Sequence, residues 1–545
     1  MIRIPTTRFR RLAWRPPALA AIALGASSAA CGPTPGETAP PVQTSPVALP
    51  SGEPVRPRPA PAHAGTPVQR PTVPFPETPA GRRGRALIDT LNRGDATALP
   101  SFVSSAFTAS FLERVPRDEV VAALRGNQRG YPGLELKRVQ FDDGHSLEAH
   151  LQSRVHGRWT VLYLSVAKAE PYGIESAWIV PSIAPLPMDQ PEIDEAEMVR
   201  SAQQIVQASC ASDGFSGAVL LAKGERVLLS HACGEASKRF HVDNTIDTKF
   251  NLGSMNKMFT AVSIAQLADR GALRYDDVVS KYIDESWLPK SITDKVTIHH
   301  LLTHTSGLGS YFNAAYQSGS RENFRVVDDY KPLVHDDRPA FEPGTSYRYS
   351  NTGMLLLGVV IEAATGQTYF DYVREHIYKS AGMEHSDSYA MDRPVENLAI
   401  GYVRDDDSVY GWRNNTFKHV IKGGPAGGGF STVGDLHRFA LALQQGRLVS
   451  ADTRNTMWTD HDGHGYGYGF QMKQGPAGRV VGHSGGFPGI SARLDIYADR
   501  GYVLAVLANY DHVASSLGDV IGDLIAKTPP TAVSSLAGPA GAVAD

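Results

Sequence analysis

The sequence has only three cysteines among its 545 residues and almost no net charge, at −3 with histidine neutral. One cysteine, Cys31, lies close to the N-terminus, so at most one disulfide is expected, between Cys210 and Cys233. These two either pair in an oxidising compartment or stay apart as small buried residues, and the sequence leaves both open. The near-zero net charge gives no excess of basic residues, so no nucleic-acid partner is expected.

Long apolar runs are also missing, because the one near the N-terminus covers only residues 18–26. Such a run is too short to span a bilayer, but five arginines precede it, as in an export signal over residues 1–30. Ser28-Ala-Ala-Cys31 then resembles a bacterial lipoprotein signal, with ordinary cleavage as the alternative. We expect an exported protein, periplasmic or lipid-anchored at Cys31, with membrane contact only through that anchor.

The remaining chain is ordinary for a soluble protein, with 42% hydrophobic and 20% charged residues, and is long enough for two or three domains. Residues 31–83 read as a linker, because fifteen prolines fall between residues 32 and 80. Residues 84–182 predict a small α+β domain, with helices first and four β-rich stretches after them. That order resembles nuclear-transport-factor-2-like domains, and we expect a packing or dimerising module without chemistry.

Residues 192–527 predict one large domain, followed by a disordered tail over residues 528–545. Its expected elements are a helix at 192–209, a hairpin of 217–221 and 226–231, a helix at 258–270, strands at 480–483, 492–497 and 502–508, and a helix at 514–526.

Ser254-Met-Asn-Lys257 is the most informative motif. A serine hydroxyl needs a base beside it, and on a helix a lysine three residues on lies on the same face. The apolar spacing after Lys257 predicts a helix, which puts Ser254 at its N-terminus. Ser165-Val-Ala-Lys168 has the same spacing, but it lies in a predicted strand, where the two side chains point to opposite faces.

Two further motifs follow. Tyr349-Ser-Asn351 lies at the entrance of a predicted helix, so its phenol and amide can face one cleft; Tyr311-Phe-Asn313 has the same pattern in a loop. The Tyr349 phenol can relay a proton if neighbouring cations lower its pKa. His483-Ser484-Gly485-Gly486 provides glycines where backbone must approach a ligand.

In this order the three motifs resemble those of the penicillin-recognising serine hydrolases, above all class C β-lactamases, esterases, D-aminopeptidases and D,D-peptidases. The resemblance covers about residues 192–527. It implies an α/β (α+β) fold of β-lactamase type, with an antiparallel sheet flanked by helices plus a helical region, and no cofactor. It also implies site roles. Ser254 is the acylated nucleophile, Lys257 the proton acceptor and Tyr349 the proton shuttle, and Asn351 holds substrate or Lys257. The backbone N–H groups of Ser254 and Gly486 form the oxyanion hole, and Ser484 and Gly485 belong to the same substrate- or oxyanion-binding strand.

His483 stands where β-lactamases of this kind usually have a lysine that binds the substrate carboxylate. An esterase or D-amino-acid peptidase is therefore expected to act on a small ester, amide or peptide, with a β-lactamase or D,D-carboxypeptidase as the alternative. A non-catalytic envelope binding protein is the alternative of another class. We also expect His483 to give a pH–rate limb near pH 6–7, as an unperturbed histidine would.

Three other patterns are weaker indicators of function. His300 and His304 have helical metal-ligand spacing but no glutamate between them, so no metal is expected. The glycine-rich run 423–429 lacks the end of a phosphate loop and predicts a turn lining the cleft. Ser484 fits Gly-x-Ser-x-Gly, but Phe487-Pro-Gly489 follows where a nucleophile elbow needs a helix.

Overall fold

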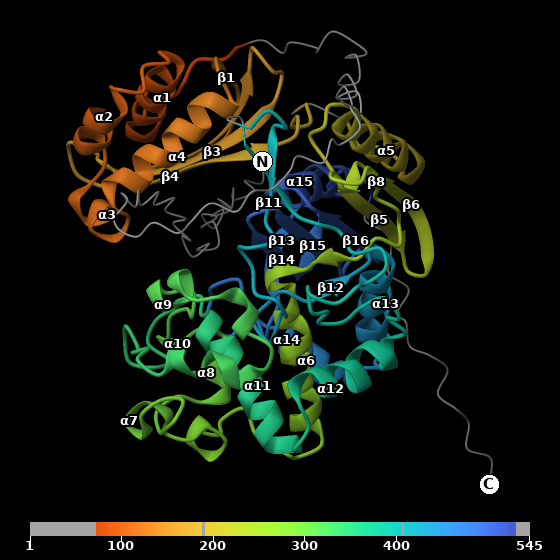
Figure 1. Ribbon diagram of the computed structural model, residues 1–545. Coiled ribbons are helices and arrows are strands. Elements are labelled where there is room, and N and C mark those ends of the chain that lie inside the picture. The colour runs from red at the N-terminus through yellow and green to blue at the C-terminus, as the bar shows by residue number, and fades with distance from the viewer. Residues whose placement is uncertain (1–71, 188–190, 406–407, 530–545) are drawn as a thin grey trace, which may run out of the picture.

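The computed structural model describes residues 72–187, 191–405 and 408–529. The predicted export signal, Cys31, the linker up to residue 71 and the tail from residue 530 lie outside these residues. In Figure 1 the first described part (orange) lies above a larger body, whose helical region (green) is at the opposite end.

The first part has helices followed by an antiparallel sheet, as expected. Its elements are α1 (Pro79–Asn92), α2 (Leu99–Ala106), α3 (Ala109–Arg114), α4 (Arg117–Gly130), β1 (Leu134–Asp142), β2 (Ser146–Ser153), β3 (Trp159–Val166) and β4 (Ile174–Ser182), with strand order β1-β2-β3-β4. α1 begins inside the predicted linker because Thr78 caps it, accepting the Gly81 N–H at 3.0 Å. The nuclear-transport-factor-2-like resemblance stays a prediction.

The larger body is built on a six-stranded antiparallel sheet. Its order is β13 (Gln471–Gly475), β14 (Gly478–Phe487), β15 (Ile490–Tyr497), β16 (Tyr502–Ala508), β5 (Gly217–Lys223) and β6 (Arg226–Cys233). Helices α5 (Glu195–Ala211) and α15 (Val513–Ala526) share a core with one face of this sheet. On the other face lies the largest core, which includes α6 (Asn256–Asp269) and α13 (Val433–Gln444). The predicted β-lactamase-like layering is therefore confirmed.

β14 is the element that differs most from its predicted range, since the sequence indicated only residues 480–483. Its second half contains Gly485 and Gly486, which have low strand propensity, and it forms because β15 pairs with it along its length up to Phe487. β13 pairs only with Gly478 to Gly482, so residues 483–487 have one edge without a strand neighbour. This free edge lies beside the turn Gly253–Met255, which carries Ser254, the predicted nucleophile, and is called the nucleophile turn below.

The helical region and the remaining short elements complete the fold. They are α7 (Lys290–Thr293), α8 (Ile298–Leu302), α9 (Ala314–Ser318), α10 (Lys331–Val334), α11 (Asn351–Thr365), α12 (Tyr369–Val373), α14 (Ala451–Met457), the single turns η1 (Gly253–Met255), η2 (Val279–Lys281), η3 (Arg321–Asn323), η4 (Val327–Tyr330) and η5 (Arg374–Lys379), and strands β7 (Glu235–Ser237), β8 (Val242–Asp243), β9 (Phe250–Asn251), β10 (Tyr402–Arg404), β11 (Trp412–Asn414) and β12 (Phe430–Ser431).

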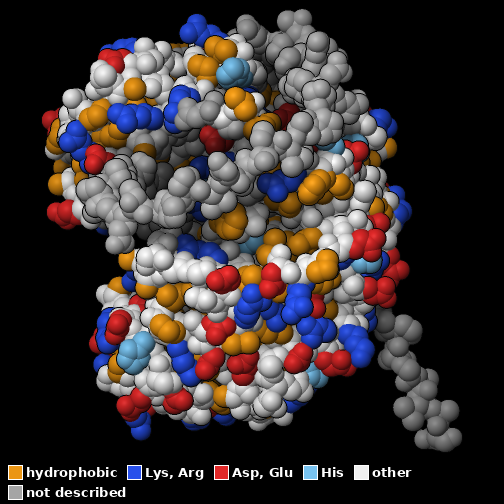
Figure 2. All heavy atoms as spheres, in the orientation of Figure 1, with side chains coloured by type: hydrophobic (Ala, Val, Ile, Leu, Met, Phe, Trp, Pro, Cys, Tyr) orange, Lys and Arg blue, Asp and Glu red, His pale blue; other side chains and the backbone are white. Residues whose placement is uncertain are grey.

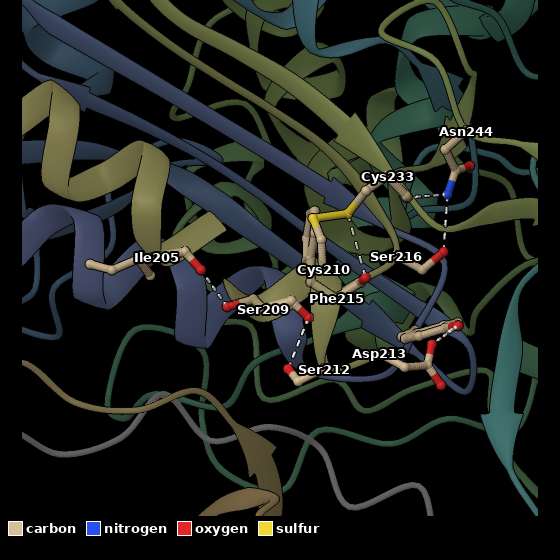
Figure 3. The surroundings of a disulfide bond; sticks show 10 residues. Ile205, Ser209, Cys210, Ser212, Asp213, Phe215, Ser216, Cys233 and Asn244 are labelled. Atoms are coloured by element: carbon tan, nitrogen blue, oxygen red, sulfur yellow. Dashed lines mark hydrogen bonds between the residues drawn. A yellow bond between two sulfur atoms is a disulfide. The ribbon is translucent and has the colours of Figure 1, made fainter. Parts of the chain in front are cut away.

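The two cysteines of the larger body form a disulfide (Figure 3). Cys210 lies in the last turn of α5 and Cys233 ends β6, with their Cα atoms 6.0 Å apart. Asn244 holds the same corner, donating to the Cys233 carbonyl at 2.9 Å and to Ser216 Oγ at 3.0 Å. The choice that the sequence left open is thus settled as pairing.

The surface carries both charges. On the face in Figure 2, basic and acidic side chains are interspersed over the larger body. Within the described residues no single helix is long and apolar enough to cross a membrane; a bent pair, Asn351–Thr365 with Tyr369–Lys379, passes on length and composition only. The first of these helices, α11, is buried in the core over residues 351–361.

Candidate active site

Ser254 lies in η1, a single turn that joins β9 to α6. Its neighbours Gly253 and Met255 are buried, whereas Ser254 is partly exposed. α6 begins two residues later, and its residues 256–267 are all buried. The predicted placement of the serine at the start of a helix is therefore confirmed, and one face of that helix carries Lys257 toward the interior.

Lys257 is fully buried, which is rare for a lysine. Its Nζ donates to Asn351 Oδ1 at 2.9 Å and to the carbonyl of Ala426. Burial lowers the pKa of Lys257 well below its ordinary value. A neutral amine has two N–H bonds and one lone pair, and both N–H bonds are used here. The lone pair is left to accept a proton.

The glycine-rich run 423–429 supplies that carbonyl, so the predicted turn does line the site. Asn256 Nδ2 donates to the Gly424 carbonyl at 3.2 Å, and the Gly428 N–H donates to the Gly253 carbonyl at 3.0 Å. These bonds fix the run against both the nucleophile turn and α6, and so place the acceptor for Lys257.

Tyr349 and Asn351 flank the N-cap of α11. Ser350 is the cap, accepting the Gly353 N–H at 2.8 Å, and the residues on either side of it both lie next to Lys257. Tyr349 shares a hydrogen bond with Ser254, and its ring centroid is 4.9 Å from Lys257 Nζ. Asn351 binds Lys257 through its oxygen and donates to Ser310 Oγ at 3.1 Å.

The condition for a proton relay, a Tyr349 pKa lowered by cations, is not met. Burial raises this pKa, and the hydrogen bond with Ser254 offsets only part of the rise. A phenol buried beside a neutral lysine keeps its proton at neutral pH. Tyr349 can therefore donate a proton but does not rest as a phenolate.

His483 is also buried and neutral. Its Nδ1 lies 2.6 Å from the Ser484 carbonyl and its Nε2 3.0 Å from the Tyr466 hydroxyl. Because a carbonyl only accepts, Nδ1 carries the proton and Tyr466 donates to Nε2. Burial lowers the pKa of His483 to about 3, and Lys257 in its protonated form adds to this lowering. The predicted limb near pH 6–7 is therefore wrong as a property of His483.

The predicted glycines of β14 lie against the nucleophile turn. A Cβ added to Gly485 would lie 1.8 Å from the Leu252 carbonyl oxygen and 3.1 Å from the Ser254 nitrogen. A Cβ on Gly253 would lie 2.8 Å from the Gly486 nitrogen. Only glycine allows the two backbones this close, which brings the N–H groups of Ser254 and Gly486 to one place. Ser484 instead bonds Gln471, with its N–H and Oγ each 3.3 Å from Oε1.

His304 and Tyr466 are members of the site that the motifs missed. The His304 ring lies between two tyrosines, with centroids 4.4 Å from Tyr349 and 4.5 Å from Tyr466. Its Nδ1 accepts the Ser350 N–H at 3.2 Å. Glycine-tyrosine alternation at residues 465–470 was the only sequence signal for Tyr466, and it is weak.

The other serine patterns of the sequence, at Ser165 and Ser484, do not have the surroundings of a nucleophile. Ser165 lies in β3 and bonds Ser176 at 2.7 Å, as a strand residue would. Ser484 is inside a strand that turns into β15, so no helix follows it. In the described part of the chain one group has metal-ligand spacing, Cys210, His231 and Cys233, and its two cysteines are in the disulfide.

With this geometry in view, comparison with known proteins gives a direct match. The Beta-lactamase family model matches residues 202–522, more than half of the chain. The chain belongs to the Beta-lactamase family. Together with Ser254 and Lys257 in one turn, membership makes it a serine hydrolase of the β-lactamase fold.

Relatives in this family carry two kinds of name. "Penicillin-binding protein 4*" of Bacillus subtilis is 33% identical over 54% of this chain and 68% of its own length. "D-aminopeptidase" of Gluconobacter oxydans is 26% identical over 56% of this chain and 57% of its own. Among solved structures, a penicillin binding protein from Bacillus halodurans is 29% identical with a TM-score of 0.54, covering 61% of this chain and 99% of that one. The first described part, residues 72–187, lies outside the range that the family model matches.

Proposed function

We propose that this protein hydrolyses amides and esters of small acyl groups, with D-amino-acid amides or short peptides as the natural class, through an acyl-enzyme on Ser254. The observation that carries the proposal is the buried Lys257, one helical turn from Ser254, whose amine donates to Asn351 and Ala426 and has a pKa lowered by burial. A serine and a lysine three residues apart on a helix, held in this way, act as a nucleophile and its base.

Acylation then follows from the protonation states. Ser254 Oγ attacks the substrate carbonyl while its proton passes to the Lys257 amine. The carbonyl oxygen becomes an oxyanion between the N–H groups of Ser254 and Gly486. Tyr349, a phenol, donates its proton to the leaving nitrogen or oxygen, and the proton held on Lys257 replaces it. Water repeats the sequence on the acyl-enzyme and releases the acid.

The substrate class follows from what His483 offers. Both of its ring nitrogens are already bonded, and it is neutral. It therefore supplies no cation for a carboxylate next to the scissile bond, which β-lactams and C-terminal peptides carry. Substrates without that carboxylate, such as amides and esters, fit this end of the site better.

The test is intact mass after a fluorophosphonate probe, beside Ser254→Ala. One added phosphonyl group on the parent and none on the variant is the expected result. Turnover of a D-amino-acid nitroanilide, nitrophenyl acetate and nitrocefin then separates amidase, esterase and lactamase. No labelling of folded parent protein would contradict the proposal.

A β-lactamase or D,D-carboxypeptidase remains the second candidate, because two of the relatives above are named as penicillin-binding proteins. Nitrocefin turnover, or release of D-alanine from an acylated D-alanyl-D-alanine peptide, faster than nitroanilide cleavage would favour it.

We further propose that the protein is exported and lipidated at Cys31, with residues 31–83 as a tether between the anchor and the folded parts. Support comes from the arginines and the small residues before Cys31. Metabolic labelling with palmitate, beside Cys31→Ala, is the test; an unlabelled parent protein would rule out the anchor.

A further inference from the structure

We propose that Phe312 and Phe487 form the acyl pocket of this enzyme and make it prefer acyl groups with an aromatic or bulky apolar side chain. This rests on the function proposed above and narrows its substrate class. The two rings come from separate segments, Phe487 from the end of β14 and Phe312 from the loop before α9, and they pack together with centroids 5.7 Å apart.

The position of Phe487 follows from strand alternation. Side chains of His483, Gly485 and Phe487 lie on one face of β14, because every second residue shares a face. That face is the one that Gly485 presses against the nucleophile turn. Phe487 is therefore two residues, about 7 Å, beyond the point where the strand meets Ser254.

The two rings are accessible rather than sealed in the core. Phe487 and Phe312 are both only partly buried, so a substrate side chain can contact them. The free edge of β14 at residues 483–487 adds backbone groups for an extended substrate.

Phe312 is tied to the catalytic residues from the other side. Ser310, two residues earlier, accepts from Asn351 Nδ2 at 3.1 Å. The Phe312 ring is supported by Tyr311, at 4.6 Å, and by Tyr316, edge-on at 4.8 Å. Tyr311 and Tyr316 are buried, so this wall is held in place before substrate binds.

The acyl group, rather than the leaving group, lies at this aromatic end. The leaving group must meet the Tyr349 phenol, which donates its proton. The ring centroids of Tyr349 and Tyr466 are 6.3 Å apart, and the Tyr466 hydroxyl is hydrogen-bonded to His483. The His483 end of the strand face thus takes the leaving group. Since Ser254 is between the two ends, the acyl side chain extends toward Phe487 and Phe312.

The experiment measures kcat/KM for nitrophenyl acetate, butyrate, hexanoate and phenylacetate, which share one leaving group. Each value is divided by the rate of spontaneous hydrolysis of that ester. We expect the parent enzyme to favour phenylacetate over acetate by at least about tenfold, as a pocket that buries the added carbons would. Phe487→Ala and Phe312→Ala should each lower that ratio several-fold, and Phe487→Leu should keep preference for hexanoate while losing part of that for phenylacetate.

Phe240→Ala is the matched control, because Phe240 is an exposed aromatic residue, 70% accessible, on the turn between β7 and β8. The phenylacetate-to-acetate ratio of this variant should equal that of the parent. A parent ratio near one overturns the proposal without needing any variant, and so does an Ala variant that is labelled at Ser254 but keeps the parent ratio. If the variants instead change the dependence on leaving group at fixed acetyl, the acyl assignment is wrong. Failure of Ser254 labelling in the parent would contradict the proposed function itself. This outcome is therefore distinct from failure of the acyl-pocket proposal, in which the parent is still labelled.

Discussion

At the scale of single residues, burial decides which groups titrate in the site. Burial lowers the pKa values of both Lys257 and His483. Lys257 is the competent base only when it is neutral, so kcat/KM should rise as pH increases through its pKa. His483, with a pKa of about 3, changes no charge in the range where enzymes are usually assayed.

The first prediction separates these two groups. His483→Gln retains a hydrogen-bonding side chain beside Tyr466, and its kcat/KM profile between pH 5 and 9 should keep the acid limb of the parent, at a lower maximum. The measurement is a pH–rate profile with nitrophenyl acetate. Loss of that limb in His483→Gln would show that His483, not Lys257, titrates.

His304 combines two unusual features. It is fully buried with a left-handed backbone, φ +61°, and its Nε2 has no hydrogen-bond partner among the described residues. Because Nδ1 accepts the Ser350 N–H, Nε2 carries the proton. Strain and an unpaired donor are costs that functional sites often carry, and here the ring positions Tyr349 at the entrance of α11.

We therefore expect His304→Gly and His304→Asn to differ. Both residues tolerate a positive φ, but only asparagine offers an oxygen toward the Ser350 N–H. His304→Gly should lower kcat by about 10- to 100-fold with a smaller change in KM, since proton transfer by Tyr349 suffers more than binding. His304→Asn should recover part of that loss. Equal kcat for the two variants, or a purely KM effect, would contradict a positioning role.

At the scale of elements, the site depends on the contact between η1 and β14. Gly485 and Gly486 are neighbours in sequence, but only Gly485 faces the Leu252 carbonyl, whereas Gly486 faces open space. The two glycines thus serve different purposes in the same strand. Gly485 allows the two backbones to touch, whereas the Cβ side of Gly486, on the opposite face of the strand, meets no neighbouring atom.

The matched pair Gly485→Ala and Gly486→Ala tests this contact. A Cβ at Gly485 must push the strand away from the nucleophile turn, so we expect a loss of several degrees in Tm and no fluorophosphonate labelling. Gly486→Ala should keep the parent Tm, because its Cβ meets no atom within 4 Å. Calorimetry and intact mass give both readouts; an unchanged Tm in Gly485→Ala would refute the close approach.

At the scale of the whole molecule, the first part and the larger body meet where the sheet of β1–β4 packs on α15. Ser516 Oγ donates to the Pro181 carbonyl at 3.2 Å, and Arg138 donates to the Leu186 carbonyl. Glu148 on β2 is partly buried in this contact and faces Asp519 and Asp523 of α15, with Arg138 and Lys473 as the opposing cations. Burial and the two aspartates raise the pKa of Glu148 to about 7.

The contact should therefore weaken as pH rises. A carboxyl with a folded pKa of about 7 and an ordinary value of 4.5 binds its proton more tightly in the folded state, so its contribution is complete below pH 4.5 and is lost as pH rises through about 7. Glu148→Gln should be more stable than the parent at pH 8 and equal to it near pH 4. Urea unfolding at both pH values is the measurement.

Glu135→Gln on the neighbouring strand is the control with the opposite sign. The hydrogen bond with Lys137 is the main cause that lowers the pKa of Glu135, so its removal should destabilise at pH 8 rather than stabilise. A Glu148→Gln variant that loses stability at pH 8, as this control should, would contradict the inferred environment of Glu148.

The sequence by itself determined the fold type and singled out Ser254 as the proposed nucleophile. The spacing of Ser254 and Lys257, the apolar periodicity after them and the order of the three motifs are local or ordered along the chain, so one-dimensional reasoning reaches them. The same holds for the hairpin of β5 and β6, and for α15, whose boundaries depend on alternation and amphipathic spacing.

Only the tertiary structure decided the chemistry of the site, because protonation depends on what surrounds a group. Lys257, Tyr349 and His483 owe their pKa shifts to burial among segments far apart in the sequence. Pairing of Cys210 with Cys233, the length of β14, and the meeting of Phe312 with Phe487 are likewise contacts between distant segments. A sequence names the groups that a site can use, but the packing around them sets their charge and their neighbours.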